Sequence, residues 1–176
     1  MHSIIYRPLD LGQPWVSLIS QISYVISFIE MKFKATISSR SSSHALGPPG
    51  ETEILNLNPQ RREMILAKTG WKKLVEGTLN LEVHKDVVSL LLTKNPTIRE
   101  PGNSVTYPSK FQHIPKIRKS YLYFKGTISK GNHSEDVLFR TAEKPLPNRF
   151  EAFAPVRLRE NLSIADGDQV DCDIPN

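Results

Sequence analysis

Short segments in which apolar and polar residues alternate, separated by turns, constrain the fold of this chain most. In "KFKATIS", residues 32–38, the alternation puts Phe33, Ala35 and Ile37 on one side of a predicted strand. Thirteen prolines against nine glycines favour rigid turns and short elements over a bundle of long helices. Further strands are predicted at 53–57, 78–83, 87–92, 120–129, 136–140, 149–153 and 169–174.

One segment is typical of a helix. Asn58 is a suitable N-cap, Pro59 suits the first turn, and "QRREMILAKT" runs to Gly70, a natural C-terminal stop. Roughly seven strands with one or two short helices predict a mainly β fold, a small closed barrel, because closure removes exposed strand edges. A tight turn at 166–168 is expected before the last strand.

Residues 1–30 differ from the rest, and we predict an N-terminal extension there and one barrel domain over 31–176. The sixteen residues "PWVSLISQISYVISFI" are shorter than the roughly 20 that a membrane span needs, and Gln21 and several serines interrupt them. No clean signal-peptide cleavage site follows. We interpret the segment as an amphipathic or loosely attached extension, or as the result of a start codon placed upstream of a true start at Met31. No stable membrane span is expected.

Composition narrows the class of site. Cys172 is the only cysteine, so no intramolecular disulfide can form, which fits a cytoplasmic protein. The five histidines lack metal-ligand spacing, which argues against a histidine metal centre. The net charge is +5, and between Glu100 and Glu135 there are only basic charges. This basic segment could face a phosphorylated ligand, water or nucleic acid. Without Arg-rich or aromatic-basic repeats, we predict no nucleic-acid binding.

The segment "GTLNLEV" is the first candidate for chemistry. In a strand, Thr78, Asn80 and Glu82 share one face while the leucines between them share the other. Oxygen-bearing side chains at this spacing can converge on Mg²⁺, which needs only one or two protein ligands when phosphates complete its shell. Gly77 allows a ligand to approach the backbone closely. The alternative is an ordinary wet strand face.

Several further motifs stand in register with that strand. They are a helix that ends in "TGW" before Gly-Thr-Leu-Asn, the pair Arg140-Thr141, then Glu151, "APVRLR" at 154–159, and Asp-Gly-Asp at 166–168. Over residues 31–175 this set resembles the archaeal-type CTP-dependent riboflavin kinases. The resemblance implies a six-stranded cradle-loop (RIFT-type) barrel. It also implies transfer of the γ-phosphoryl group of CTP to riboflavin, giving FMN and CDP.

The resemblance also implies roles for individual residues. Thr78 and Asn80 would hold Mg²⁺, and Thr141 and Glu151 would contact the flavin. Glu151 would accept the hydroxyl proton or position the hydroxyl, while Glu82 would have only a supporting role or face solvent. The cytidine nucleotide would be contacted by Val156, Arg157, Leu158 and Arg159, and its phosphates by a loop that includes Gly47, Gly50, Glu51 and Thr52.

The chain departs from this family in the phosphate loop, where Pro48 and Pro49 lack the backbone N–H that a phosphate cradle uses. Ala142 and Glu143 follow Arg140-Thr141, where the family tends to place a histidine. A catalytically silent flavin- or nucleotide-binding barrel is therefore the alternative. Either protein is expected to be a monomer or a weak dimer.

Overall fold

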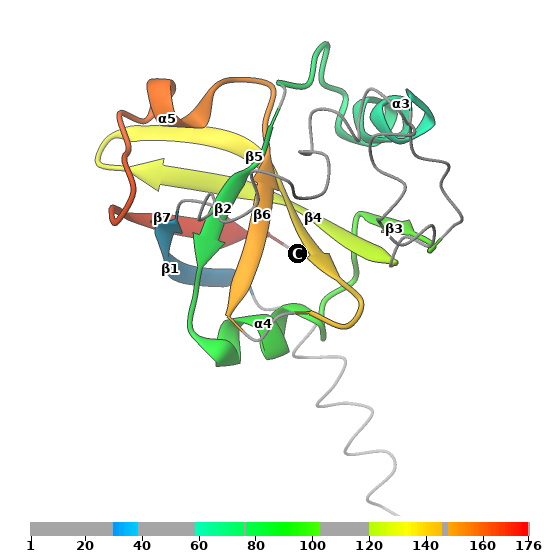
Figure 1. Ribbon diagram of the computed structural model, residues 1–176, viewed down its shortest axis with the longest axis horizontal. Helices are drawn as coiled ribbons and strands as arrows, with labels where there is room; N and C mark the ends of the chain where they lie inside the picture. The colour runs from blue at the N-terminus through cyan, green and yellow to red at the C-terminus, as the bar shows by residue number, and fades with distance from the viewer. Residues whose placement is uncertain (1–29, 39–58, 76, 103–119, 146–147, 176) are drawn as a thin grey trace, which may run out of the picture.

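The computed structural model describes residues 30–38, 59–75, 77–102, 120–145 and 148–175 (Figure 1). The fold is mainly β. Its elements in chain order are β1 (Met31–Ser38), α3 (Pro59–Thr69), β2 (Leu79–Glu82), α4 (Lys85–Leu91), β3 (Ile98–Glu100), β4 (Tyr121–Lys130), β5 (His133–Ala142), β6 (Arg149–Phe153), α5 (Leu158–Asn161) and β7 (Gln169–Ile174).

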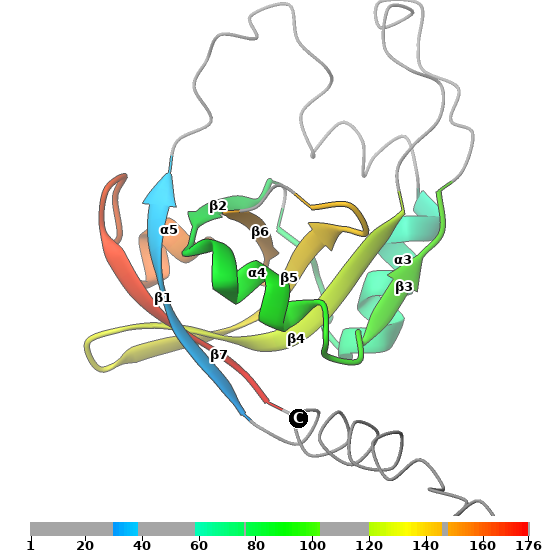
Figure 2. The ribbon, with the colours of Figure 1, turned by 90° about the horizontal axis from the view of Figure 1, so that it is seen from below.

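The strands form a closed barrel. Their order is β3-β4-β5-β6-β2-β1-β7, and a second pairing of β4 with β7 closes six of them into a ring. All the pairings are antiparallel. The short strand β3 stays outside the ring on the free edge of β4, and α3 lies beside it (Figure 2). The predicted small six-stranded barrel is confirmed.

The period-two pattern of the strands builds two apolar clusters, one on each face of the sheet. The barrel interior contains Leu81, Phe124, Phe139 and Phe150, with the Phe33 ring centroid 5.9 Å from those of Phe139 and Phe150. Helices α4 and α5 add apolar side chains to this interior from opposite sides of the barrel (Figure 1). The second cluster lies under α3 and contains Ile65, Leu74, Ile98, Tyr123, Leu138 and Phe153.

Helix α3 covers the outer face of β3 to β6, and its predicted limits are confirmed. It ends at Thr69, and Gly70 follows with φ of +76°, a conformation that favours glycine. The Gly70 N–H donates to the Leu66 carbonyl at 2.9 Å, which closes the last turn. Ile65 is fully buried on the barrel-facing side of the helix.

The prediction of a strand at 87–92 is wrong, because these residues belong to α4 and its C-cap, Leu92. The His84 side chain caps the helix by accepting from the Asp86 N–H. Val88 and Leu91, three residues apart, point to the barrel interior, while Leu90 is exposed. A short apolar run fits a strand and a buried helix face equally well, and periodicity does not separate the two.

Three other outcomes concern the segments between strands. The strand β3 and the short helix α5 lie in segments for which the sequence analysis predicted no element. The turn at 166–168 is confirmed: Gly167 has φ of +87°, and the Asp168 carboxylate accepts from the Ala165 N–H at 2.9 Å. That backbone hydrogen bond, aided by Lys130, lowers the pKa of Asp168. The strand predicted at 53–57, the Asn58 cap and the extension up to residue 29 lie outside the described residues.

Within the part of the chain that the structure describes, none of the helices has the length and apolar character needed to cross a bilayer.

Gly126 is required where β4 meets β7. A Cβ at this position would lie 2.2 Å from the Asp173 carbonyl oxygen and 2.7 Å from Cε2 of Phe139. We predict that Gly126→Ala lowers the free energy of unfolding by about 3 kcal/mol, the upper end for overpacking, because a backbone atom must move. Urea denaturation followed by circular dichroism measures this loss.

Gly131→Ala is the matched control for this prediction. Gly131 has φ of +59°, but the space that an added methyl group would fill is open, so only the backbone cost of about 1 kcal/mol applies. The Cys172 thiol, opposite Ile128 in the same β4–β7 ladder, gives a second readout. Burial, helped by Asp171, raises the pKa of Cys172 to about 12, so it labels slowly until the ladder opens. Equal losses for the two variants would contradict the role assigned to Gly126.

Candidate functional site

A cavity of about 210 Å³ lies where β2 begins and β6 ends, next to α5. It brings together Gly77 and Thr78 with Val156, Arg157, Leu158 and Arg159, two groups of residues that the sequence placed about eighty positions apart. The remaining lining residues are Val75, Leu79, Ala152, Ala154 and Glu160. Thr78, one of the two residues predicted to hold the metal, therefore shares a pocket with the four residues predicted to hold the nucleotide, and Asn80 does not line it.

The backbone holds the two sides of the pocket together. The Val75 N–H donates to the Ala154 carbonyl at 3.0 Å, which ties the segment before β2 to the segment after β6. Gly77 has φ of +96°, a backbone conformation that residues other than glycine rarely adopt. Ala152 and Ala154 keep the wall small and apolar. The pocket therefore offers a small apolar wall to a ligand, with polar groups at its rim.

The two arginines at the rim each have a carboxylate partner. Arg157 Nη1 lies 3.3 Å from Glu160 Oε1, and Arg159 Nη2 lies 2.5 Å from Asp166 Oδ1. Both pairs are exposed, and exposed pairs contribute at most about 1 kcal/mol. A phosphate oxygen could replace either carboxylate at little cost.

A row of polar residues crosses the outer face of the barrel beside this pocket. Ser38 of β1 is paired with Asn80 of β2, Asn80 with Glu151 of β6, and Glu151 with Arg140 of β5. Residues that face each other across antiparallel strands share a face of the sheet. The neighbouring pair, Leu79 with Ala152, lies in the pocket wall. Asn80 and Glu151 are the next residues along these strands, so they face the outside of the barrel while Leu79 and Ala152 face its interior.

Ser38, Thr78 and Asn80 are the residues in this region that could offer oxygen ligands to a magnesium ion. Ser38 Oγ is buried and has no hydrogen-bond partner within the described ranges, which leaves an oxygen available opposite Asn80. Thr78 and Asn80 add a hydroxyl and an amide, which are hard ligands. No group of three or more His, Cys, Asp or Glu side chains suited to a metal occurs among the described residues. The negative charge around such an ion would therefore come mainly from phosphates.

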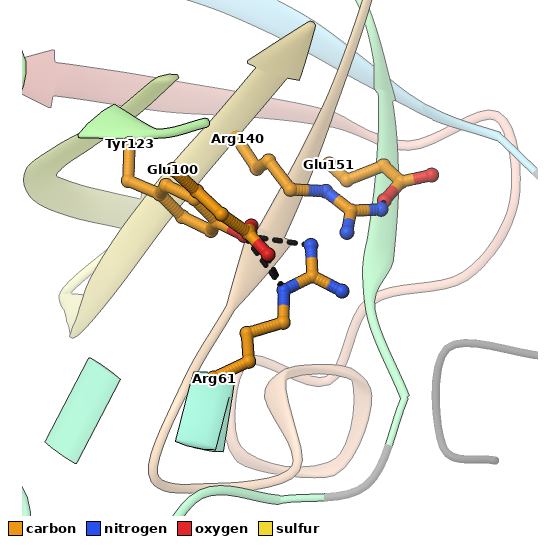
Figure 3. A network of polar contacts seen from close by, with 5 residues as sticks. All are labelled: Arg61, Glu100, Tyr123, Arg140 and Glu151. Carbon is orange, nitrogen blue, oxygen red and sulfur yellow. Dashed lines mark hydrogen bonds and ion pairs between the residues drawn. The ribbon is translucent and has the colours of Figure 1, made fainter. Parts of the chain in front are cut away.

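Glu151 is held by a buried arginine. Oε2 of Glu151 accepts a charge-assisted hydrogen bond from Nη2 of Arg140, whose side chain is only 6% exposed. The Arg140 guanidinium lies 4.6 Å from the Tyr121 ring centroid and 5.1 Å from that of Phe153. Figure 3 shows the other carboxylate oxygen of Glu151 pointing away from Arg140. That oxygen is the acceptor that Glu151 can offer to a ligand.

A second buried arginine lies next to the first (Figure 3). Arg61 of α3 donates to the Tyr123 hydroxyl from Nε at 2.9 Å and from Nη2 at 2.6 Å, and its Nε lies 3.1 Å from Glu100 Oε2. The Tyr123 hydroxyl in turn donates to Glu100 at 2.5 Å. Burial is the main cause that raises the pKa of Tyr123, so this hydroxyl keeps its proton. Two guanidinium groups are thus balanced by two carboxylates beneath α3.

The other predicted site residues are placed differently. Thr141 is buried opposite Leu122, a residue of the interior core, so its side chain faces the inside of the barrel while Glu151 faces the outside. One ligand could contact both only near the end of β5. Gly47, Gly50, Glu51 and Thr52 lie outside the described residues.

Several residues of the site were not found from the sequence. Ser38 lay at the end of a predicted strand without any special signal, and Arg61 had the pattern of an ordinary helix surface. Arg140 was recognised only as part of the Arg140-Thr141 motif, without a role of its own, although an arginine that directly follows the apolar residues of "DVLF" indicates a charge that needs a buried partner.

Comparison of the chain with protein-family models and with curated protein sequences found no match.

Loss of the Glu151 charge should destabilise the fold, because Arg140 would remain buried without its carboxylate. We predict that Glu151→Gln lowers the free energy of unfolding by about 3 kcal/mol, the lower end for breaking a buried pair, since Glu151 is partly exposed. Glu82→Gln is the matched control, because Glu82 is paired with Arg149 at 3.2 Å in an exposed pair and should cost less than about 1 kcal/mol. Urea denaturation measures both, and equal effects would mean that burial of Arg140 does not matter.

Proposed function

We propose that this protein is a magnesium-dependent, CTP-using riboflavin kinase that produces FMN and CDP. One observation carries the proposal: a single pocket unites Gly77 and Thr78 with the segment 156–159, and Asn80 and Glu151 are the next residues along the two strands whose Leu79 and Ala152 line it. These are the residues to which the resemblance to archaeal-type riboflavin kinases assigns the metal, the nucleotide and the flavin. The support is therefore the convergence of separate sequence motifs on one place in the barrel.

The cytidine nucleotide would occupy the pocket, with its base against the small wall formed by Ala152 and Ala154. Its phosphates would extend toward Thr78, where Gly77 leaves the backbone accessible. Arg159 would exchange Asp166 for a phosphate oxygen, and Arg157 would exchange Glu160. Such contacts fix the donor in line, and positioning is the main task of a protein in phosphoryl transfer.

Thr78 and Asn80 would hold the magnesium ion, with Ser38 beside them. The bound ion would neutralise phosphate charge. The outward carboxylate oxygen of Glu151 would accept a hydrogen bond from the ribityl hydroxyl of riboflavin and aim it at the donor. These residues would supply orientation and a shielded site, and little covalent chemistry.

The alternative is a barrel that binds flavin or nucleotide without turnover. Two observations favour it: both rim arginines are already neutralised by carboxylates, and Pro48 and Pro49 remove two N–H donors from the phosphate loop. In both cases the partners are small molecules. A cytoplasmic location, and a monomer or weak dimer, belong to this proposal.

The direct test is an assay of FMN formation from riboflavin with Mg²⁺ and CTP, UTP, ATP or GTP. We expect FMN with CTP and far less with ATP. Isothermal titration calorimetry with riboflavin and with CTP, run alongside, separates the two functions. Tight binding without FMN from any nucleotide would select the silent barrel.

The assignment of the metal residues gives a second prediction. Thr78→Ala and Asn80→Ala should each lower kcat about 100-fold or more, with a higher Mg²⁺ concentration needed for half-maximal rate, because each removes an oxygen from a charge-stabilising site. Glu82→Gln, which alters the same strand face farther from the pocket, should leave both quantities within about twofold of the unmodified protein. Unchanged turnover and magnesium dependence in the two alanine variants would show that the ion lies elsewhere.

A further inference from the structure

We propose that Arg140 is a positioning residue of this site: it fixes the carboxylate of Glu151 for the flavin hydroxyl, and it is held in place through the buried charges that dock α3. The inference rests on the proposed function, because it assumes that Glu151 faces a ligand. It assigns a role to a residue that does not line the pocket.

The first step is the restraint on Arg140 itself. Its guanidinium contacts the faces of Tyr121 and Phe153, with centroid distances of 4.6 and 5.1 Å, and its side chain is 6% exposed. A planar group packed between rings has few alternative rotamers, so its N–H groups keep a fixed direction. Lysine at the same position would keep the charge but neither the planar fork nor the stacking.

The second step is the effect on Glu151. One carboxylate oxygen is bound to Arg140, so rotation of the carboxylate is restricted and the other oxygen keeps a constant direction (Figure 3). Asn80, the proposed metal contact, lies directly opposite Glu151 on the next strand. The acceptor for the hydroxyl and the contact for the metal are therefore held side by side on neighbouring strands. Displacement of a reacting group by about 1 Å can lower a rate about 100-fold.

The third step is the link to α3. The Tyr121 ring lies under both guanidinium groups, 5.4 Å from the Arg61 carbon Cζ and 4.6 Å from that of Arg140. Arg61 is anchored by Tyr123 and Glu100, and Tyr123 is the cross-strand partner of Arg140. Two like charges so near each other need both carboxylates close by. The position of α3 therefore supports the direction of Arg140, and through it that of Glu151.

A double-mutant cycle on kcat and on the KM for riboflavin tests the inference, with the variants Arg140→Met, Glu151→Gln and the two combined. Arg140→Met should lower kcat/KM for riboflavin about 10- to 100-fold while the KM for CTP changes less than about twofold, since the pocket is untouched. The double variant should lose no more than the worse single variant, because Arg140 acts only through Glu151. Arg140→Lys should recover only part of the loss.

Arg149→Met is the matched control, because Arg149 lies on the same outer face but pairs with Glu82 at the surface. It should leave all kinetic constants within about twofold. Urea denaturation of each variant, with assays well below its unfolding midpoint, separates positioning from loss of fold. A folded Arg140→Met with unchanged constants overturns the inference, as does a double variant whose loss is the product of the single losses.

The riboflavin kinase proposal can fail separately. If the unmodified protein binds riboflavin, measured by quenching of its fluorescence, but forms no FMN, the kinase function is wrong. The same cycle is then read in the dissociation constant of riboflavin, with the same expected non-additivity. If the unmodified protein neither binds nor phosphorylates riboflavin, both proposals are overturned.

Discussion

The pairing of β4 with β7 is the contact on which the rest of this structure depends. Without it, the sheet would be an open ribbon with two free edges, and its interior cluster would face water. Gly126 permits the pairing, since the Asp173 backbone lies where any side chain would be. Because β4 also pairs with β5 and β3, one long strand connects the closed ring to the outer layer beneath α3.

Closure gives every strand an inside and an outside, and in this protein the two faces have different tasks. Apolar residues such as Leu81 and Phe150 fill the interior, while the residues that alternate with them, Asn80 and Glu151, form the polar row outside. The strand register that places the core residues inside the barrel therefore also places the site residues outside it. A shift of β2 by one residue would move Asn80 into the interior and Leu81 into the site.

The outer layer is unusual in that charges dock the helix together with apolar contacts. Burial of Arg61 and Arg140 carries a desolvation cost, offset here by two carboxylates, the Tyr123 hydroxyl and aromatic rings. Apolar side chains such as Ile65 pack the same face of α3 against the sheet. The hydrogen bonds of Arg61 add a directional restraint on α3, and Arg140 beside it binds the carboxylate of Glu151.

Much of the barrel could be predicted from sequence because strands of period two and a capped helix are local patterns. The helix at 59–69 and the strands over 149–153 and 169–174 belong to this class. The run at 87–92 could not be resolved locally, since its environment, the interior of the barrel, decides between helix and strand. The network could not be predicted either, because Arg61, Glu100 and Arg140 come from three separate elements and meet only after closure. Thr78 and the segment 156–159 were recognised only as motifs, and the fold supplies their common pocket.

The order of strands around the ring has a consequence for how the protein is made. Strand β1 is flanked by β2 and β7, and Lys34 bonds to Asp171, a residue 137 positions later in the chain. At synthesis rates of about 5–20 residues per second, β1 waits roughly 7 to 27 seconds for this partner. During that interval its edge can pair with other chains. A nascent chain of this protein should therefore depend on chaperones until β7 has left the ribosome, and its ligands can stabilise it only afterwards.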